Sequence, residues 1–281
     1  MDILDIHSLL GIVKFAGPDI KLYQLFLSNR SFAKFCKENQ KFVQEFFTIC
    51  INGVYKLNGQ LHSIRDQPAM ISDKGTKYWY KNGKHHRDGD LPSAIHTDGT
   101  QVWSRHGIIH RDGDLPAIMY GDGKLEWIQH GNLHRDGDLP AIIHVNGDKE
   151  WCQHGQRHRS NDLPAIIRID GTQEWFQSGK RHRDGDLPAL ISSSGIQTWY
   201  KCDNIHRDGD QPAFIDEDGT KKWYKHDRHH RDGDLPAKIY ADGTLHWYRY
   251  GVRHRDEDLP ASIFSNGHKE WYKNGKKYKQ T

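Results

Sequence analysis

Hydrophobic and polar residues recur along this chain with a fixed period of 24 residues. In one repeat Trp175 is followed by Gly179, His182 and Pro188, and the next repeat opens at Trp199. All nine tryptophans and nine of the ten prolines belong to this series. A fixed period of this length indicates a repeat architecture, in which each unit packs mainly against its neighbours. We expect the tryptophans to form the core, and they are Trp79, Trp103, Trp127, Trp151, Trp175, Trp199, Trp223, Trp247 and Trp271.

Within each repeat the local pattern predicts β-hairpins. Dipeptides such as Asp98-Gly99 and Asn82-Gly83 tolerate the positive φ angles that tight turns require. A strand of β-branched and aromatic residues is expected over 220–224. Proline then interrupts the ladder, because it has no N–H to donate. Alternation along the next strand places Ala189 and Ile191 on one face, so alanine, isoleucine, tryptophan and proline are predicted to form one core stripe.

The first 50 residues follow a different pattern. They contain no tryptophan, and apolar residues such as Phe32, Phe35, Phe42 and Phe46 are spaced by three, four or a sum of the two. This spacing is typical of buried helix faces. We therefore expect a small helical cap over residues 1–50, which would cover the apolar end of the array.

Part of this segment resembles an F-box. The residues that carry the likeness are Leu9, Phe15, Pro18, Asp19, Ile20, Leu22, Leu25, Leu27, Ser28, Arg30 and Phe32. The resemblance implies docking on the Skp adaptor subunit of a cullin ubiquitin ligase, with the C-terminal repeats capturing the substrate. The Leu-Pro opening common in that family is missing here. A plain end cap is the alternative interpretation.

The repeats themselves resemble the MORN repeat. In one unit the likeness runs from Asp242-Gly243-Thr244 through Trp247-Tyr248 and Gly251 to His254-Arg255. The period of 24 departs from that family, as does Asp-Leu-Pro-Ala in place of its later Gly-x-Gly. The array looks like a divergent form of the kind abundant in large DNA viruses of amoebae. The resemblance implies a single-layer twisted sheet with interaction or scaffold roles and no shared catalytic activity.

The expected fold is therefore mainly β. It consists of an elongated single-layer antiparallel β-hairpin repeat array over residues 51–281, with nine to ten units and a small N-terminal α-helical cap over 1–50.

Composition agrees with such an array and bears on location. Only 35% of the chain is hydrophobic, and 40 basic and 37 acidic residues are interspersed. This mixed surface does not predict nucleic-acid binding. The four cysteines follow no framework, and the start has no signal-peptide pattern, so we expect an intracellular, soluble protein, in the host cytoplasm or virion if viral. The lysines near the C-terminus would give only weak attachment to an anionic membrane surface.

Three motifs suggest chemistry, but their repetition argues against it. His-Arg-Asp heads the kinase catalytic loop, yet it occurs seven times without the other kinase motifs. Histidines one repeat apart would lie ~10 Å from each other, too far to share a metal ion. One fixed aspartate per repeat is too few for calcium. We expect that aspartate to bond turn N–H groups or the arginine column, and each histidine to pack on a neighbouring ring and bond backbone. No catalytic residue, metal or cofactor is predicted.

The position after each tryptophan is the predicted partner-binding strip. Rigid aromatic residues flanked by basic ones are typical of protein-interface anchors. The residues assigned to this strip are Tyr200, Tyr224, Tyr248, Tyr272, Phe176, Lys201, Lys225 and Arg249. Ordinary packing on the second face of the sheet is the alternative.

These observations favour a non-catalytic protein-interaction repeat protein, with a role as substrate adaptor for a Skp-cullin-F-box type ligase. The alternative is a structural scaffold, virion-associated or membrane-associated, that assembles through its repeats.

Overall fold

The computed structural model describes residues 49–51, 54–57, 59–64 and 66–281. This part of the chain is built of short β-strands, and it contains no helix. The strands pair antiparallel throughout. The prediction of a β-hairpin array is therefore confirmed, whereas the predicted helical cap and its F-box-like residues lie outside the described residues. The chain divides into two compact units between Asn132 and Leu133.

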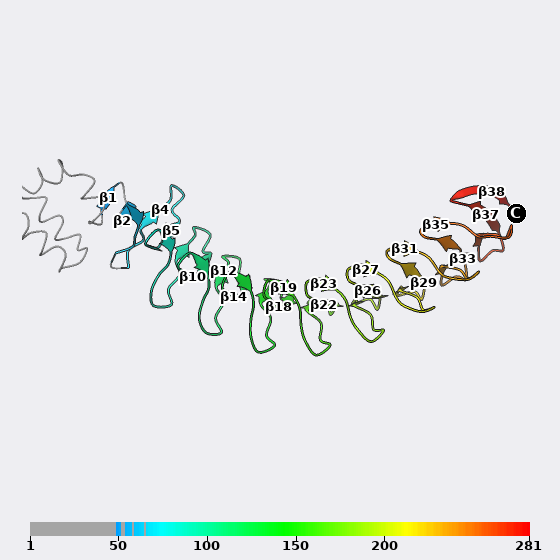
Figure 1. Cartoon of the computed structure of the whole chain (residues 1–281), viewed down its shortest axis with the longest axis horizontal. Helices are drawn as coiled ribbons and strands as arrows, with labels where there is room; N and C mark the ends of the chain where they lie inside the picture. The colour runs from blue at the N-terminus through cyan, green and yellow to red at the C-terminus, as the bar shows by residue number, and fades with distance from the viewer. Residues whose placement is uncertain (1–48, 52–53, 58, 65) are drawn as a thin grey trace, which may run out of the picture. The chain divides into compact units, whose positions relative to one another are not determined.

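The repeats before the last contribute four two-residue strands each, as the repeat from Ala165 to Pro188 shows. Strands β20 (Ile166–Ile167) and β21 (Gln173–Glu174) join a ladder that the neighbouring repeats continue. Strands β22 (Phe176–Gln177) and β23 (Lys180–Arg181) form a separate hairpin. The residues from His182 to Pro188 connect to the next repeat, and we call this segment, with its equivalents, the joint loop. Within each unit the repeats follow one another in sequence order (Figure 1).

The first unit contains a small opening sheet, ladder strands and hairpin strands. The opening sheet is β1 (Ile49–Ile51), β2 (Val54–Leu57) and β3 (Gln60–Leu61). The ladder strands are β4 (Met70–Ile71), β5 (Lys77–Tyr78), β8 (Ala94–Ile95), β9 (Gln101–Val102), β12 (Ile118–Met119) and β13 (Leu125–Glu126). The hairpin strands are β6 (Tyr80–Lys81), β7 (Lys84–His85), β10 (Ser104–Arg105), β11 (Ile108–Ile109) and β14 (Ile128–Gln129). Strand β15 (Asn132–Leu133) lies at the division.

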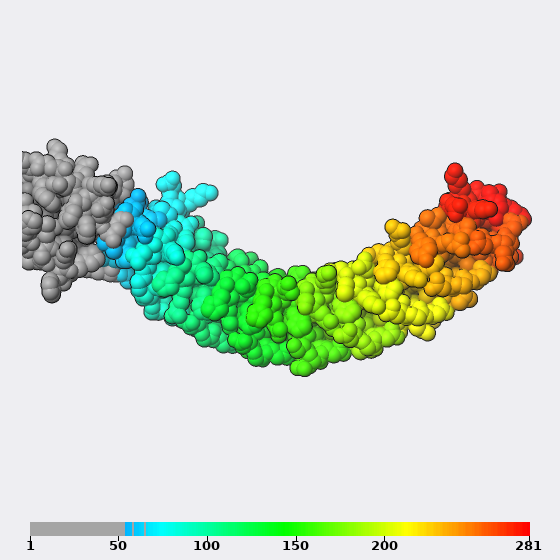
Figure 2. All heavy atoms as spheres, viewed as in Figure 1, coloured from blue at the N-terminus to red at the C-terminus, as the bar shows by residue number. Residues whose placement is uncertain are grey.

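The second unit repeats this plan up to the C-terminus. Its other ladder strands are β16 (Ile142–Ile143), β17 (Lys149–Glu150), β24 (Leu190–Ile191), β25 (Gln197–Thr198), β28 (Phe214–Ile215), β29 (Lys221–Lys222), β32 (Lys238–Ile239), β33 (Leu245–His246), β36 (Ser262–Ile263), β37 (Lys269–Lys273) and β38 (Lys276–Gln280). Its other hairpin strands are β18 (Cys152–Gln153), β19 (Gln156–Arg157), β26 (Tyr200–Lys201), β27 (Asn204–Ile205), β30 (Tyr224–Lys225), β31 (Arg228–His229), β34 (Tyr248–Arg249) and β35 (Val252–Arg253). Figure 2 shows successive repeats of this unit as adjoining bands of colour.

Two kinds of turn close these hairpins, both as the dipeptides predict. In the ladder, the N–H of His96 donates to the carbonyl of Thr100, and Gly99 has a φ of 90°. This is a three-residue loop with glycine in the left-handed region. In the separate hairpin, Asn82 and Gly83 both have positive φ, at 50° and 73°. Two successive positive φ angles define the type I′ turn that suits a two-residue hairpin.

The tryptophan column forms the core, as the sequence predicts. All nine tryptophans are between 4% and 7% exposed, and the alanine column, with Ser93 in one repeat, is at most 1% exposed. The isoleucine column was predicted to share this core, and that prediction is wrong. Ile71 is 52% exposed, and its equivalents are only half-buried. Several of them face a polar residue across the strands, as Ile167 faces Gln173, but Ile239 faces Leu245 and is half-buried as well.

The strand predicted over 220–224 is divided at its tryptophan. Strands β29 and β30 lie on either side of Trp223, and they belong to different sheets. The N–H of Trp223 donates to the carbonyl of Ala237, and its own carbonyl accepts the N–H of His230. The tryptophan is therefore the corner at which the chain leaves the ladder and enters the separate hairpin. Each repeat adds two strands to the shared ladder, as expected, and two more to a hairpin of its own.

An arginine in each joint loop ties neighbouring repeats together. The guanidinium carbon of Arg183 lies 3.9 Å from the ring centroid of Trp175. Its Nε and Nη2 atoms each donate to a different oxygen of Asp162, at 2.7 Å, and Nη1 donates to the carbonyl of Pro188. Asp162 belongs to the preceding joint loop, so one side chain connects two repeats. These N–H bonds hold the pKa of the Asp162 carboxyl below its usual value.

The same contact recurs in both units and confirms that the aspartate column pairs with the arginine column. In the first unit it is formed by Arg87 with Trp79 and Asp66, and by Arg111 with Trp103 and Asp90. In the second unit the other sets are Arg159 with Trp151 and Asp138, Arg207 with Trp199 and Asp186, Arg231 with Trp223 and Asp210, and Arg255 with Trp247 and Asp234.

The histidine of several joint loops contacts the turn of the following hairpin. The ring of His110 stacks on His130, with centroids 4.7 Å apart, and its Nδ1 accepts the N–H of that residue at 3.3 Å. The other ring nitrogen, Nε2, lies 3.0 Å from a carboxylate oxygen of Asp112. The predicted structural role of the histidines, packing on a neighbouring ring and bonding backbone, is confirmed at this position.

The last hairpin replaces the contacts that a further repeat would provide. The amine of Lys279 lies 4.6 Å from the ring centroid of Trp271, where other repeats place an arginine. The hydroxyl of Tyr278 donates to Asp258 at 2.9 Å, in place of the guanidinium N–H groups. Strand β38 pairs with β37 and carries lysines, which discourage edge-to-edge pairing.

We predict that Arg207→Lys lowers the free energy of unfolding by about 1–2 kcal/mol, because lysine loses the planar stack on Trp199 and the bidentate bond to Asp186. Urea unfolding followed by tryptophan fluorescence would measure the change. Arg249→Lys, at an exposed arginine, should shift the midpoint little. Equal midpoints for Arg207→Lys and the unaltered protein would contradict the role of the joint.

Candidate partner-binding face

The residues that alternate with the tryptophan form a second face of each repeat. In the repeat of Trp175 these are Ile166, Glu174, Phe176 and Arg181, and register pairs Ile166 with Glu174 and Phe176 with Arg181. We call the surface made by these four positions in successive repeats the variable face, because their chemistry changes from repeat to repeat. The position of Phe176, for example, holds serine, isoleucine, cysteine or tyrosine elsewhere. Substitutions on the variable face can therefore change what a repeat recognises without changing its fold.

On the second unit the variable face carries a row in which aromatic rings alternate with arginine or histidine side chains, except that Ile205 takes this position opposite Tyr200. Arg181 lies between two rings, 5.4 Å from the centroid of Phe176 and 5.6 Å from that of Tyr200. Further along, the ring of His229 lies 4.2 Å from that of Tyr224 and 5.1 Å from that of Tyr248.

The row continues to the last repeat. Arg253 lies 5.6 Å from the ring centroid of Tyr248 and 4.8 Å from that of Tyr272. We call this whole row, from Arg157 to Tyr272, the aromatic–cation row. Stacked cations fix the orientation of the rings and present polar edges beside apolar ones, which suits protein recognition.

The structure separates the residues that the sequence assigned to the partner-binding strip. Tyr200, Tyr224, Tyr248 and Tyr272 are half-buried on the variable face. Phe176 is only 5% exposed and packs in a core cluster with Trp151, Ala165 and Ile166, so it cannot contact a partner directly.

The three basic residues of that strip face the joint loops instead. Lys201 pairs with Asp208 at 2.7 Å, and Arg249 pairs with Asp256 at 2.9 Å. Lys225 lies 3.5 Å from Asp232. Because successive residues of a strand point to opposite sides, a basic residue directly after a tyrosine cannot flank that tyrosine. The N–H groups of Lys201 lower the pKa of the Asp208 carboxyl to about 2, with a smaller effect of His206.

The arginine and histidine side chains that do flank the aromatic residues are not their neighbours in sequence. Arg157, Arg181, His229 and Arg253 stand six residues after a tryptophan and two residues after the hairpin turn. A two-residue turn pairs the residue before it with the residue after it, and the next pair outward is Phe176 with Arg181. The position of the Ser178–Gly179 turn therefore predicts that Arg181 lies opposite Phe176.

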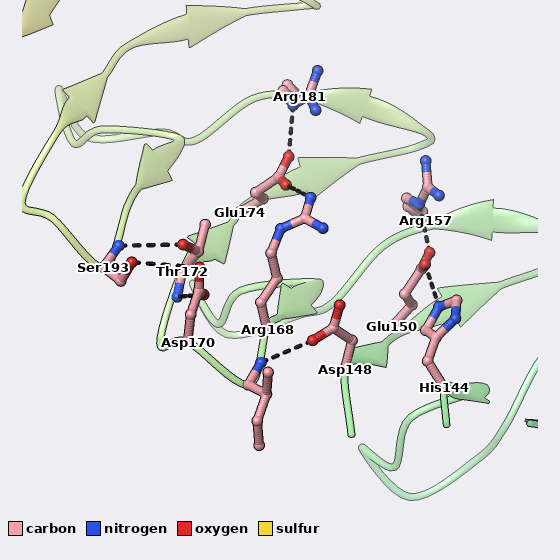
Figure 3. A network of polar contacts seen from close by, with 11 residues as sticks. His144, Asp148, Glu150, Arg157, Arg168, Asp170, Thr172, Glu174, Arg181 and Ser193 are labelled. Carbon is pink, nitrogen blue, oxygen red and sulfur yellow. Dashed lines mark hydrogen bonds and ion pairs between the residues drawn. The ribbon is translucent and has the colours of Figure 1, made fainter. Parts of the chain in front are cut away.

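Buried carboxylates anchor one end of the aromatic–cation row (Figure 3). The side chain of Glu174 is 2% exposed and accepts Nε of Arg181 at 2.8 Å on one oxygen and Arg168 on the other. In the preceding repeat the side chain of Glu150 accepts Nε of Arg157 at 2.7 Å, and its other oxygen lies 2.8 Å from Nε2 of His144. A buried carboxylate is stable in this form only because both of its oxygens are paired.

Two histidines near the other end are held neutral. Burial, with smaller effects of Arg253 and Lys238, lowers the pKa of His246 to about 4. Burial likewise lowers the pKa of His229 to about 4, assisted by Lys238 and Lys222. Nδ1 of His246 lies 3.2 Å from Nη2 of Arg253, so a protonated His246 would meet a guanidinium directly.

Open clefts lie between successive joint loops. In the second unit one cleft of about 630 Å³ lies between the loops that begin at His230 and His254, and Arg249 lines it. A second, of about 400 Å³, lies between the loops of His206 and His230, and Lys225 lines it. The arginines and aspartates of their walls are those of the joint, so their polar groups already bond one another.

The chain matches no known family model and no curated protein. Among the residues that the structure describes, no helix has the length and apolar character needed to cross a membrane.

Stability of the second unit should fall as the pH drops from 6.5 to 4. His246 is 5% exposed, and its pKa near 4 means that the unfolded chain binds a proton that the folded protein excludes over this range. The contribution of neutral His246 is therefore present above pH 6.5, and we expect about 2–3 kcal/mol to be lost by pH 4.5. Urea midpoints at pH 7 and pH 4.5 would measure the loss.

His246→Thr supplies the matched variant, because Thr198 occupies the same position two repeats earlier. Between the two pH values, His246→Thr should lose about 2–3 kcal/mol less stability than the unaltered protein. His268→Thr, at a more exposed histidine, should lose as much stability as the unaltered protein. An unchanged pH dependence in His246→Thr would contradict the assignment.

Proposed function

We propose that this protein is a non-catalytic protein-interaction repeat protein that binds its partner through the aromatic–cation row. The observation that carries this proposal is the alternation of half-buried tyrosines with stacked arginine and histidine side chains on the variable face. Rings of this kind supply contact area at little cost in side-chain entropy, and they are frequent anchors at interfaces. The repeated joint keeps them at regular intervals.

A non-catalytic role is supported by how the repeated polar groups are used. In the joint loop of His110, both ring nitrogens are engaged, one by a backbone N–H and one by a carboxylate. The guanidinium of Arg111 donates to both oxygens of Asp90 and to a backbone carbonyl. Groups that serve as joint contacts in repeat after repeat are poorly placed to act as the general base of a reaction.

The role as a substrate adaptor of a Skp-cullin-F-box type ligase is a further part of the proposal. It rests on the sequence resemblance of residues 1–50 alone. In this arrangement the N-terminal segment would bind the Skp subunit, and the repeats would capture the substrate through the aromatic–cation row.

Replacing tyrosines of the row should weaken partner capture. We expect Tyr200→Ala with Tyr224→Ala to reduce recovery of the partner from cell extract by about tenfold or more, because interface aromatics carry a large share of binding energy. Quantitative mass spectrometry of the captured proteins would measure it. Tyr250→Ala is the matched control, because Tyr250 is exposed and stacks on His230 of a joint loop. Circular dichroism melting must show that the variants remain folded, and unchanged capture by a folded double variant would exclude this face.

Deleting residues 1–50 should separate the adaptor from a scaffold. We expect the truncated protein to lose the Skp subunit and retain the partner bound by the repeats. Immunoprecipitation of both forms from the same cells would measure the two associations. Absence of the Skp subunit from both samples would reject the adaptor role, and self-association of the repeats in sedimentation would favour a scaffold.

A further inference from the structure

We propose that the exposed ends of Arg157 and Arg181 form a binding site for an acidic segment of a partner protein, one that presents carboxylates in an extended conformation. This inference rests on the proposed function and assigns the chemistry of the partner at one end of the aromatic–cation row.

The two arginines occupy equivalent positions in adjacent repeats. Arg157 lies at the end of β19 and Arg181 at the end of β23, and their guanidinium carbons lie 5.6 and 5.4 Å from the ring centroid of Phe176. Each is held through its Nε by a buried carboxylate, Glu150 or Glu174 (Figure 3). This contact uses the inner edge of the guanidinium and directs the two Nη atoms outward. The outer edge is the one that binds a carboxylate with two parallel hydrogen bonds.

In this cluster the negatively charged side chains are buried and the positively charged ones are partly exposed. The side chains of Glu150 and Glu174 are 11% and 2% exposed, whereas those of Arg157 and Arg181 are 48% and 38% exposed. Arg168, the second partner of Glu174, is 42% exposed. An approaching ligand therefore meets guanidinium groups, and the compensating negative charge lies beneath them. Side chains already fixed in this way lose little entropy when they bind.

The fold does not require these carboxylates. The ladder position of Glu174 holds Val102 and Thr198 in other repeats, whose backbone pairs in the same register. A paired buried charge contributes little to stability compared with a well-packed neutral side chain. Four repeats nevertheless carry a glutamate here, at 126, 150, 174 and 270, and the two adjacent repeats of Glu150 and Glu174 also carry an arginine at the position across the hairpin. Groups of this kind that the fold can do without are expected at functional sites.

The chemistry favours a carboxylate-bearing peptide over a nucleic acid. Phe176, the ring between the two arginines, is buried and cannot stack on a base. The whole chain carries a net charge of only +3, with acidic residues interspersed, so it offers no extended track for a phosphate backbone. In a β-strand, alternate side chains project to the same side about 6.8 Å apart. The two guanidinium carbons lie at most about 11 Å apart, because they are 5.6 and 5.4 Å from the same ring centroid, and a peptide with an acidic residue at every second position presents carboxylates along that span.

The test is the binding of a fluorescein-labelled dodecapeptide of alternating glutamate and serine to the full-length protein, measured by fluorescence anisotropy at physiological salt. We expect saturable binding, lost when glutamine replaces each glutamate. Arg157→Gln with Arg181→Gln should weaken binding by about tenfold or more, and Lys225→Gln with Arg249→Gln, which removes the same charge on the other side of the strands, by less than about twofold. A Kd above about 1 mM for the unaltered protein would overturn the proposal.

Charge-conserving variants guard against loss of folding. Arg157→Lys with Arg181→Lys keeps both positive charges near the buried glutamates but removes the bidentate edge, and binding should still weaken by about threefold or more. Unchanged affinity in this variant would overturn the geometric part of the proposal. Tighter binding of single-stranded oligothymidine than of the acidic peptide would overturn the choice of partner.

Glu174 is a positioning residue in this proposal. The direction in which its replacement changes peptide affinity distinguishes positioning from simple charge attraction. Glu174→Gln makes the surface more positive, so simple attraction predicts tighter binding of the acidic peptide. If Glu174 orients Arg181, the same variant should bind several-fold more weakly. Tighter binding would overturn the positioning role. Loss of peptide binding together with intact, tyrosine-dependent partner capture would refute this inference alone, whereas tyrosine-independent capture would refute the proposed function.

Discussion

The contact on which this structure depends is the guanidinium group that covers a tryptophan and binds an aspartate of the preceding repeat. Because only 35% of the chain is hydrophobic, each repeat has little apolar surface to bury. The tryptophan of a repeat therefore needs a further side chain that covers it from solvent. Arg183 covers Trp175 in this way. Its hydrogen bond to Asp162 also connects its repeat to the preceding one. Core packing and the joining of repeats are thus achieved by a single side chain.

This arrangement frees the other side of the strands. Because the tryptophan side supplies the conserved packing, residues on the variable face need only be compatible with the hairpin register. They range from Val102 and Thr198 to the charged Glu174 at one position of the ladder. Aromatic and cationic side chains can therefore be placed in a row without disturbing the fold, and the pairs that cost stability are confined to a few repeats.

Much of the fold could be predicted from the sequence, because the period and the turn dipeptides act locally. The tryptophan core, both turn types and the pairing of the aspartate and arginine columns follow from spacing. The site was harder to predict, because its residues are neighbours across a hairpin and not along the chain. Lys201 follows Tyr200 in sequence yet faces the joint loop, while Arg181 meets the same ring from the other strand. The burial of the isoleucine column could not be predicted from alternation either, because Ile167 opposite Gln173 and Ile239 opposite Leu245 are both only half-buried.

The last hairpin, in which Lys279 and Tyr278 take the places of an arginine side chain, has a consequence for how such a protein can change in length. In a repeat with the arginine joint, the arginine binds an aspartate of the preceding repeat, and the aspartate of the same repeat binds the arginine of the next one. Whole repeats can therefore be duplicated or lost by recombination without leaving one of these side chains unpaired. The hairpin that carries Tyr278 and Lys279 departs from this pattern, because these two side chains make the contacts with Trp271 and Asp258 themselves. A change of length in steps of 24 residues is therefore open to the repeats that carry the arginine joint.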